Sequence, residues 1–183
     1  MDVDKKNIIT KYGSNEEYLV ICDHSSNNIP IEYKNLGISS NDIESHRAYD
    51  LGASEVSVEL SKLLNCNLIM ANFSRLLIDP NRGEDDPTLI PKISEGKIIK
   101  GNINISKCSS DEDRNKRILN FYLPYHEQIS KFVNNSLKKG KILKILSIHS
   151  FTPIWMGKKR EIDVGILWDK DDRLSKIFLN SLK

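Results

Sequence analysis

Tyr18-Leu-Val-Ile-Cys22 is a short apolar run, and the polar stretch Asp23-His24-Ser-Ser-Asn27 follows it at once. The run is rich in residues that favour β-strands, and unbroken apolarity over this length indicates a strand buried on both faces of a parallel sheet. His24 then stands just past the carboxyl end of that strand. Ligands bind at this edge of open α/β sheets, so the stretch predicts both a fold class and the position of a site.

Working outward, strand and helix patterns alternate along the chain. Further strands are predicted at residues 67–70, 76–78, 142–148 and 163–168, and helices from residue 49 to about 64, from 111 to about 138 and from 173 to 182. Strands that alternate with helices imply an α/β fold of three layers, αβα, with a mostly parallel or mixed central sheet covered on both faces.

The two longer helices carry apolar stripes at helical spacing. The predicted inner stripes are Ala53, Val56, Leu60, Leu63 and Leu64 in the first, and Ile118, Phe121, Tyr122, Tyr125, Ile129 and Phe132 in the second. Ser110 is the expected N-cap of the second helix, Pro124 should kink it, and Gly140 should end it. Residues 83–109 are rich in Pro and Gly and predict an ordered excursion with short strands, of a length typical of a functional loop or lid.

Length and composition narrow the class of protein. A chain of 183 residues is expected to form one domain over residues 1–183. Its formal net charge of +2, with both signs scattered, argues against a nucleic-acid partner, and its apolar runs are far too short for a membrane span. No secretory signal begins the chain, and three cysteines without CxxC spacing favour neither disulfides nor a thiolate metal cluster. We therefore expect a cytoplasmic protein.

Two histidines suggest a metal site. His24 and His149 each follow an apolar strand and precede small hydroxyl residues, so their imidazoles could meet on one cation, although structural histidines are common. Zn²⁺ favours nitrogen and oxygen ligands and activates water for attack on amides. The third ligand could be Asp50, His46 or Asn27. Asp50 is preferred because a carboxylate also offsets the charge of the metal. The alternatives are that Asp50 is an acid near a helix N-terminus that interacts with the helix dipole, and that His46 lies behind the ligands or on the surface.

Arg75 and Arg82 flank the predicted strand at residues 76–78, and Asn81 lies in the turn after it. A guanidinium group binds a carboxylate through two hydrogen bonds, or stabilises an oxyanion beside a metal. Each arginine alone could equally be a solvated surface charge. Together with Asn81 they predict groups that bind a substrate carboxylate.

Several motifs in order carry a family resemblance that extends from about residue 18 to 182. They are Cys22-Asp-His-Ser-Ser-Asn27, His46-Arg-Ala-Tyr-Asp-Leu-Gly-Ala53, Ser74-Arg-Leu-Leu-Ile-Asp-Pro-Asn-Arg82, Asp86-Pro-Thr-Leu-Ile-Pro91, Gly101-Asn102, Tyr122-Leu-Pro-Tyr-His126, Ser147-Ile-His-Ser-Phe-Thr-Pro153 and Val164-Gly-Ile-Leu-Trp168. Together they resemble the N-formylglutamate amidohydrolase family, especially its predicted-hydrolase branch, within the phosphorylase/hydrolase-like fold group of zinc carboxypeptidases, aspartoacylase and muramoyl amidases.

The resemblance implies zinc-dependent hydrolysis of the amide bond of a small acidic N-acyl amino acid such as N-formylglutamate. It implies His24, Asp50 and His149 as zinc ligands and Arg75 as the catalytic arginine. The expected substrate-binding residues are Asn27, Asn81, Arg82 and Ser150. The alternatives are a non-catalytic domain that binds a small acid and an amidase for peptidoglycan fragments.

Two departures from the family pattern matter. Where carboxypeptidase-like enzymes have a His-x-x-Glu pair, this chain has His24-Ser-Ser-Asn27. Family members also continue for some tens of residues past the position of Lys183, with a glutamate that acts as general base. The resemblance thus implies that the chain lacks the C-terminal part of the fold, and the uncovered sheet would favour self-association into a homo-oligomer.

Overall fold

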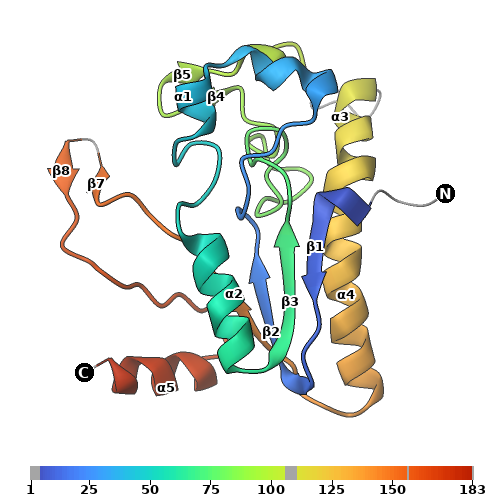
Figure 1. The fold of residues 1–183 in the computed structure, drawn as a ribbon, viewed down its shortest axis with the longest axis vertical. Helices are drawn as coiled ribbons and strands as arrows, with labels where there is room; N and C mark the ends of the chain where they lie inside the picture. The colour runs from blue at the N-terminus through green and yellow to red at the C-terminus, as the bar shows by residue number, and fades with distance from the viewer. Residues whose placement is uncertain (1–4, 106–110, 156, 183) are drawn as a thin grey trace. The chain divides into compact units, whose positions relative to one another are not determined.

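The structure, a computed structural model, describes residues 5–105, 111–155 and 157–182 (Figure 1). The chain divides into two compact units, Met1–Phe151 and Thr152–Lys183. One domain over residues 1–183 stays a prediction.

A four-stranded sheet lies at the centre of the first unit, in the order β1-β3-β2-β6. The central strands are β2 (Asn15–Cys22) and β3 (Cys66–Ala71), which are parallel, and β6 (Lys144–Ser147) is parallel to β2 on its other side. These confirm three predicted strands, the last of them shorter than expected. The fourth, β1 (Ile8–Lys11), runs antiparallel to β3 and makes the sheet mixed.

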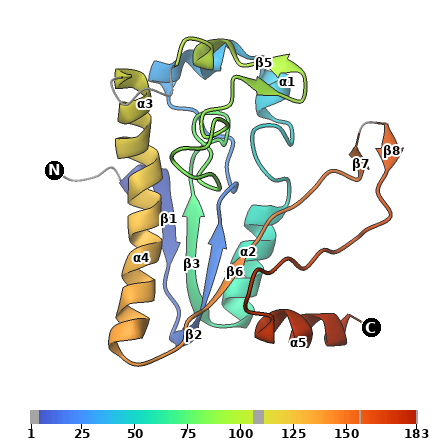
Figure 2. The ribbon, with the colours of Figure 1, turned by 180° about the vertical axis from the view of Figure 1, so that it is seen from behind.

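Helices cover both faces of this sheet because successive strand residues point to opposite sides. On one face, Leu19 and Ile69 pack in a core cluster with side chains of α4 (Leu123–Lys138). On the other, Val20 and Leu68 pack in a second cluster with α2 (Ala53–Leu63). Figure 1 and the reverse view in Figure 2 show the two helices on either side of the strands. The predicted three-layer α/β fold is confirmed.

The inner face of α2 matches the predicted stripe in part. Ala53, Leu60 and Leu64 pack in the second cluster as predicted, whereas Val56 and Leu63 are 55% and 83% exposed. The buried face also contains Ser57 and Ser61, whose hydroxyls donate to carbonyl oxygens of the same helix, and a satisfied hydroxyl can be buried at low cost. Apolarity alone therefore identified only part of this face.

The strand predicted at residues 76–78 is wrong. Leu76, Leu77 and Ile78 are each at most 1% exposed, but they form a buried turn. Ser74 organises the turn: its carbonyl accepts a hydrogen bond from Leu77 N, and its hydroxyl accepts one from Leu76 N and donates to the carbonyl of Ala48. The apolar run reflects burial in the core and not pairing in the sheet.

Short elements fill the connections of the first unit. They are the 3-10 helices η1 (Lys5–Asn7), η2 (Ile31–Gly37) and η3 (Lys100–Asn102), the helix α1 (Ser40–Ile43) and the hairpin of β4 (Ile93–Ser94) with β5 (Lys97–Ile98). The hairpin confirms short strands in the excursion that begins at residue 83. Residues 106–109 of that excursion and the predicted cap Ser110 lie outside the described residues.

The long helical region before β6 has three parts: α3 (Glu112–Arg117), the π-helical segment η4 (Ile118–Tyr122) and α4. Asp111 caps its start by accepting a hydrogen bond from Arg114 N. Pro124 stands in the first turn of α4, which follows the π segment. The irregularity in place of the predicted kink is thus a change from π-helical to α-helical hydrogen bonding. Gly140, with φ of +64°, follows the last turn and confirms the predicted end.

The second unit contains the hairpin of β7 (Ile154–Trp155) with β8 (Lys158–Lys159), and the helix α5 (Arg173–Ser181), which confirms the prediction from residue 173. The strand predicted at residues 163–168 is wrong: those residues have no regular structure, and Val164 and Leu167 are 63% and 93% exposed. No described strand pairs with them to satisfy their backbone groups. Among the described helices, none has the length and apolarity needed to cross a membrane.

Candidate metal centre

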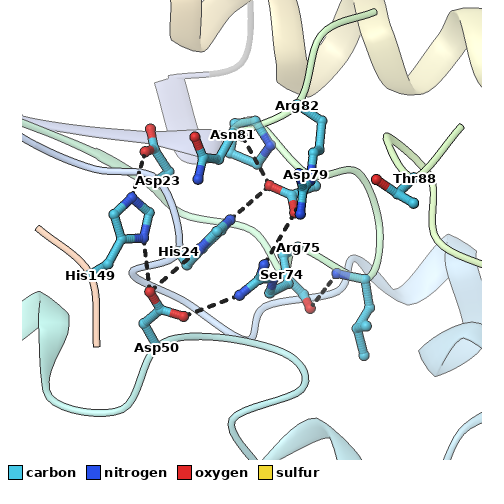
Figure 3. Close-up of polar contacts among 12 residues, drawn as sticks. Asp23, His24, Asp50, Ser74, Arg75, Asp79, Asn81, Arg82, Thr88 and His149 are labelled. Atoms are coloured by element: carbon cyan, nitrogen blue, oxygen red, sulfur yellow. Dashed lines mark hydrogen bonds and ion pairs between the residues drawn. The ribbon is translucent and has the colours of Figure 1, made fainter. Parts of the chain in front are cut away.

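Three residues far apart in the sequence converge at the carboxyl edge of the sheet. His24 follows β2, His149 follows β6, and Asp50 lies in the turn before α2 (Figure 3). One ligand atom from each lies within 4.8 Å of the other two. The two histidines meet because β2 and β6 are adjacent parallel strands, and Asp50 is held beside them by a hydrogen bond of 2.9 Å from its backbone N to the carbonyl of His24.

The His24 ring is buried, and Asp79 contacts the ring nitrogen that faces away from Asp50. Its Nε2 lies 2.7 Å from Asp79 Oδ1, while its Nδ1 lies 3.4 Å from Asp50 Oδ2. At 1% exposure, that Nδ1 has no hydrogen-bond partner among the described residues. A buried ring nitrogen that is left unpaired and faces a carboxylate and a second imidazole is suited to a cation, and a carboxylate on the other ring nitrogen is the usual support of a metal-binding histidine.

His149 has a matching arrangement. Its Nδ1 lies 2.9 Å from Asp50 Oδ2, and its Nε2 lies 3.2 Å from Asp23 Oδ2. Asp23 is itself fixed, because its carboxylate accepts hydrogen bonds from the Tyr125 hydroxyl at 2.7 Å and the Ser147 hydroxyl at 3.1 Å. Each histidine therefore directs one nitrogen at Asp50 and the other at a buried orienting carboxylate.

Arg75 links two of the carboxylates. Its Nη1 donates to Asp50 Oδ1 at 3.2 Å, and its Nη2 donates to Asp79 Oδ2 at 3.3 Å. The side chain is 28% exposed. Arg75 therefore offsets part of the negative charge of Asp50 and Asp79, and its guanidinium group has N–H donors beyond these two bonds.

The charges in the cluster shift the pKa values of its members. Burial would raise the pKa of Asp50, but the hydrogen bond from His149, the close contact with His24 and the charge of Arg75 hold it well below its usual range. Hydrogen bonds to Asp23 and Asp50 raise the pKa of His149 to about 9. Burial acts to lower the pKa of His24, yet its contacts with Asp50 and Asp79 leave that pKa above the ordinary value. The cluster thus favours positive charge between its carboxylates, as protons or as a metal ion.

The donor set fits a divalent cation. Two imidazole nitrogens and one carboxylate oxygen form a ligand set typical of catalytic zinc sites, which leave a coordination position open. The unpaired Nδ1 of His24 and the two orienting carboxylates support that fit. His24, Asp50 and His149 are the residues that could hold the ion.

The predicted substrate-binding residues Asn81 and Arg82 lie beside Asp79 (Figure 3). The backbone N of Asn81 donates to Asp79 Oδ1 at 2.9 Å, and Arg82 Nε lies 3.8 Å from Asp79 Oδ2. The Arg82 side chain is 46% exposed. Ser150 reaches the cluster through its backbone N, which donates to Asp50 Oδ2 at 3.2 Å.

Two predicted residues have their contacts elsewhere. Asn27 donates from Nδ2 to the carbonyl of Ile43 at 3.2 Å. His46 lies with its Nε2 2.7 Å from Glu95 Oε2, an acid of the hairpin between β4 and β5, and is not one of the three clustered ligands. The structure therefore favours Asp50 over His46 and Asn27 as third ligand.

Sequence reasoning missed Asp23, Asp79 and Tyr125. Asp23 directly precedes His24, and Asp79 lies two residues before Asn81, so their position near the same sheet edge could have suggested them as orienting carboxylates. Tyr125 lies on α4, fully buried, in the predicted core stripe. Only the layer arrangement places its hydroxyl at Asp23.

The layered α/β fold, with histidines and carboxylates gathered past the strand ends, defines an α/β protein with a candidate metal centre at the carboxyl edge of its sheet. The chain belongs to the N-formylglutamate amidohydrolase family, which it matches over residues 16–183. The family name describes hydrolysis of an amide bond.

Two solved structures have a similar fold. A gene product from Agrobacterium tumefaciens is 33% identical, with a TM-score of 0.89; the match covers 96% of this chain and 68% of that one. An N-formylglutamate amidohydrolase from Ralstonia eutropha JMP134 is 19% identical, with a TM-score of 0.61 over 80% of this chain and 57% of its own, and supports the fold alone. No curated protein sequence matches the chain.

Proposed function

We propose that the protein is a zinc-dependent amidohydrolase that cleaves the amide bond of a small acidic N-acyl amino acid such as N-formylglutamate. The observation that carries the proposal is the convergence of His24, Asp50 and His149 within 4.8 Å, with a buried, unpaired Nδ1 on His24. Membership in an amidohydrolase family gives that cluster its reaction type.

Two histidines would bind the ion, and two carboxylates would orient their rings. His24 and His149 would bind through the nitrogens that face Asp50, while Asp79 and Asp23 keep the two rings in place. When bound, zinc would polarise the amide carbonyl and acidify a water molecule. The low pKa of Asp50 keeps its carboxylate charged and ready to serve as the third ligand.

The arginines would handle the substrate. Arg75 has donors left after its bonds to Asp50 and Asp79, and we assign it the developing oxyanion of the amide carbonyl. Arg82, which is nearly half exposed, and Asn81 lie on the Asp79 side of the site and would bind a substrate carboxylate. These roles imply a substrate with a carboxylate close to the scissile amide.

One observation favours a second candidate, a domain that binds a small acid without cleaving it. Asp23, Asp50 and Asp79 each contact a histidine or Arg75. Within the described cluster, no carboxylate is thus free to accept a proton from water, as a general base must.

Metal analysis tests the zinc site. The protein loaded with zinc and then desalted should hold about one equivalent per chain, and His24→Ala or His149→Ala should lose it. His46→Ala and His126→Ala are matched controls, because both rings lie outside the cluster and should leave the zinc content unchanged. A folded wild-type protein that retains no zinc would end the proposal.

Activity separates the two candidates. The zinc-loaded protein should release formate and glutamate from N-formylglutamate, and Arg82→Ala should raise KM more than it lowers kcat because it removes substrate binding. Zinc binding and competitive binding of glutamate without any turnover would favour the second candidate.

A further inference from the structure

The turn of residues 74–79 carries Arg75 and Asp79 of the site. Two buried side chains outside the site bind the backbone of this turn. Arg75 and Asp79 project from this turn towards the ligands. The carbonyl of Leu76 accepts a hydrogen bond from Asn102 Nδ2 at 2.8 Å, and the carbonyl of Leu77 accepts one from Arg117 Nη1 at 2.9 Å. Both leucines are at most 1% exposed, so no water would replace either bond.

Arg117 is a charged side chain at 1% exposure, which is unusual unless it is fully paired. Its Nε and Nη2 donate to the two carboxylate oxygens of Asp113, and Nη1 also donates to Asn102 Oδ1 at 2.7 Å. The Tyr33 ring lies 4.9 Å from the centre of its guanidinium group. Hydrophobic packing alone would not need an arginine here, because burying its charge costs desolvation energy that an apolar side chain avoids.

Asn102 is fully buried and has both ends of its amide occupied. Besides the bond to Leu76, its Nδ2 donates to the carbonyl of Pro91 at 2.8 Å, while its Oδ1 accepts from Arg117. One side chain thus ties the turn of residues 74–79, the excursion near Pro91 and the helical region of α3 together. Arg117 and Asn102 thus form a buried hydrogen-bond network, and such a network restricts the backbone of the turn to one geometry.

We infer that Arg117 and Asn102 are positioning residues of the active site, which fix Asp79 and Arg75, and through Asp79 the ring of His24, by holding the carbonyls of Leu76 and Leu77. The bond between Asp79 and His24 is 2.7 Å long, and displacement of the turn would misplace both the ring and the guanidinium group. Catalytic constellations need placement within about 0.5 Å. The metal-binding consequence rests on the proposed function; the placement of His24 does not.

Three variants test the pair. Arg117→Met removes all donors at similar length, Arg117→Lys restores one donor and the charge, and Asn102→Asp keeps the acceptor for Arg117 but removes the donor to Leu76. Phe132→Ala is the matched control: it perturbs the same core cluster from far along α4, where the side chain packs near Tyr12. Thermal unfolding of each variant is measured first, so that effects are compared at temperatures where all are folded.

Three readouts distinguish positioning from general stability. In the metal-free protein, the ring signals of His24 in a ¹⁵N NMR spectrum should shift in Arg117→Met and Asn102→Asp but not in Phe132→Ala. Zinc affinity should fall about tenfold in the same variants, the low end of the 10–100-fold effect of groups that orient metal ligands, with partial recovery in Arg117→Lys. In the active enzyme, kcat should fall while KM changes little.

Unchanged His24 signals and unchanged zinc affinity in a folded Arg117→Met protein would overturn the inference. Should that variant not fold, the same two readouts on Asn102→Asp decide in the same way. If the wild-type protein binds no zinc, the proposed function fails, and the His24 signals alone decide whether the pair positions the ring.

Discussion

At the scale of single residues, Tyr125 shows how a core side chain can serve the site. Its ring is fully buried on α4, and its hydroxyl donates to Asp23, the carboxylate that holds His149. Burial and the neighbouring charge of Asp23 raise the pKa of the tyrosine well above its usual value, so the hydroxyl keeps its proton as a donor. The residue contributes to both packing and orientation.

Tyr125→Phe keeps the packing and removes the hydrogen bond to Asp23. We expect a loss of about 1–3 kcal/mol in the free energy of unfolding, because a buried charged acceptor loses a donor, and weaker zinc binding through His149. Urea unfolding and zinc titration check this. Tyr122→Phe is the control: its hydroxyl donates to the carbonyl of Arg82, so it should leave zinc affinity unchanged. Equal zinc affinity in both variants would contradict the role of Tyr125.

The raised pKa of His149 predicts a pH dependence of zinc binding. The free protein holds a proton on this ring up to about pH 9, since Asp23 and Asp50 stabilise the charged form. A ligand nitrogen must lose that proton, so zinc affinity should rise as pH increases from about 6.5 and level off above about 9. Titrations in non-coordinating buffers measure this. An affinity that is flat between pH 6.5 and 9 would show that His149 does not bind the ion.

At the scale of elements, the sequence predicted the strands that carry the two histidines. Residues 18–22 and 142–148 are apolar runs that end at polar clusters, and the structure makes them adjacent parallel strands. Their neighbouring carboxyl ends bring His24 and His149 to ring centroids 5.0 Å apart. For residues 18–22 the pattern was sufficient because a parallel strand that is covered on both faces is apolar throughout. The second strand, β6, is only partly buried, with Ile145 42% exposed.

Other elements could not be predicted from local pattern. The run Leu76-Leu77-Ile78 is as apolar as a strand, but its carbonyls are taken by Asn102 and Arg117, which are distant in sequence. The strand β1 was missed because its residues are only partly buried and give a weak signal. The orienting roles of Asp23 and Asp79 likewise depend on distant partners, and a single sequence does not identify such pairs.

The connection between β1 and β2 gives a prediction for an element. Gly13 lies so close to the backbone of Asn65 and Cys66 that an added Cβ would lie 2.6 Å from Cys66 N and would also clash with the carbonyl of Asn65. Gly13→Ala should therefore cost about 1–3 kcal/mol in the free energy of unfolding by forcing strand ends apart.

Gly165→Ala is the control, because the nearest atom to its added Cβ is 3.8 Å away and its φ is not positive. It should change stability by less than about 0.5 kcal/mol. Urea unfolding of both variants measures the difference. Equal stability of the two proteins would mean that the connection is looser than the structure shows.

At the scale of the whole chain, the candidate ligands couple three distant segments. A metal that binds only the folded chain stabilises it by mass action, by about 2.7 kcal/mol when the free ion is at 100 times its dissociation constant. Thermal unfolding should therefore move to higher temperature with zinc and return with a chelator. His149→Ala should lose this response, whereas His126→Ala should keep it. A wild-type midpoint that zinc does not move would argue against binding by the native fold.

The spacing of the ligands along the chain also sets an order of events during synthesis. His24 and Asp50 leave the ribosome early, but His149 is made 99 residues after Asp50. At about 5–20 residues per second, the nascent polypeptide waits roughly 5–20 s for its last imidazole. Until then the first histidine and the aspartate have no third member, so the full set of candidate ligands cannot assemble before residue 149 has been made.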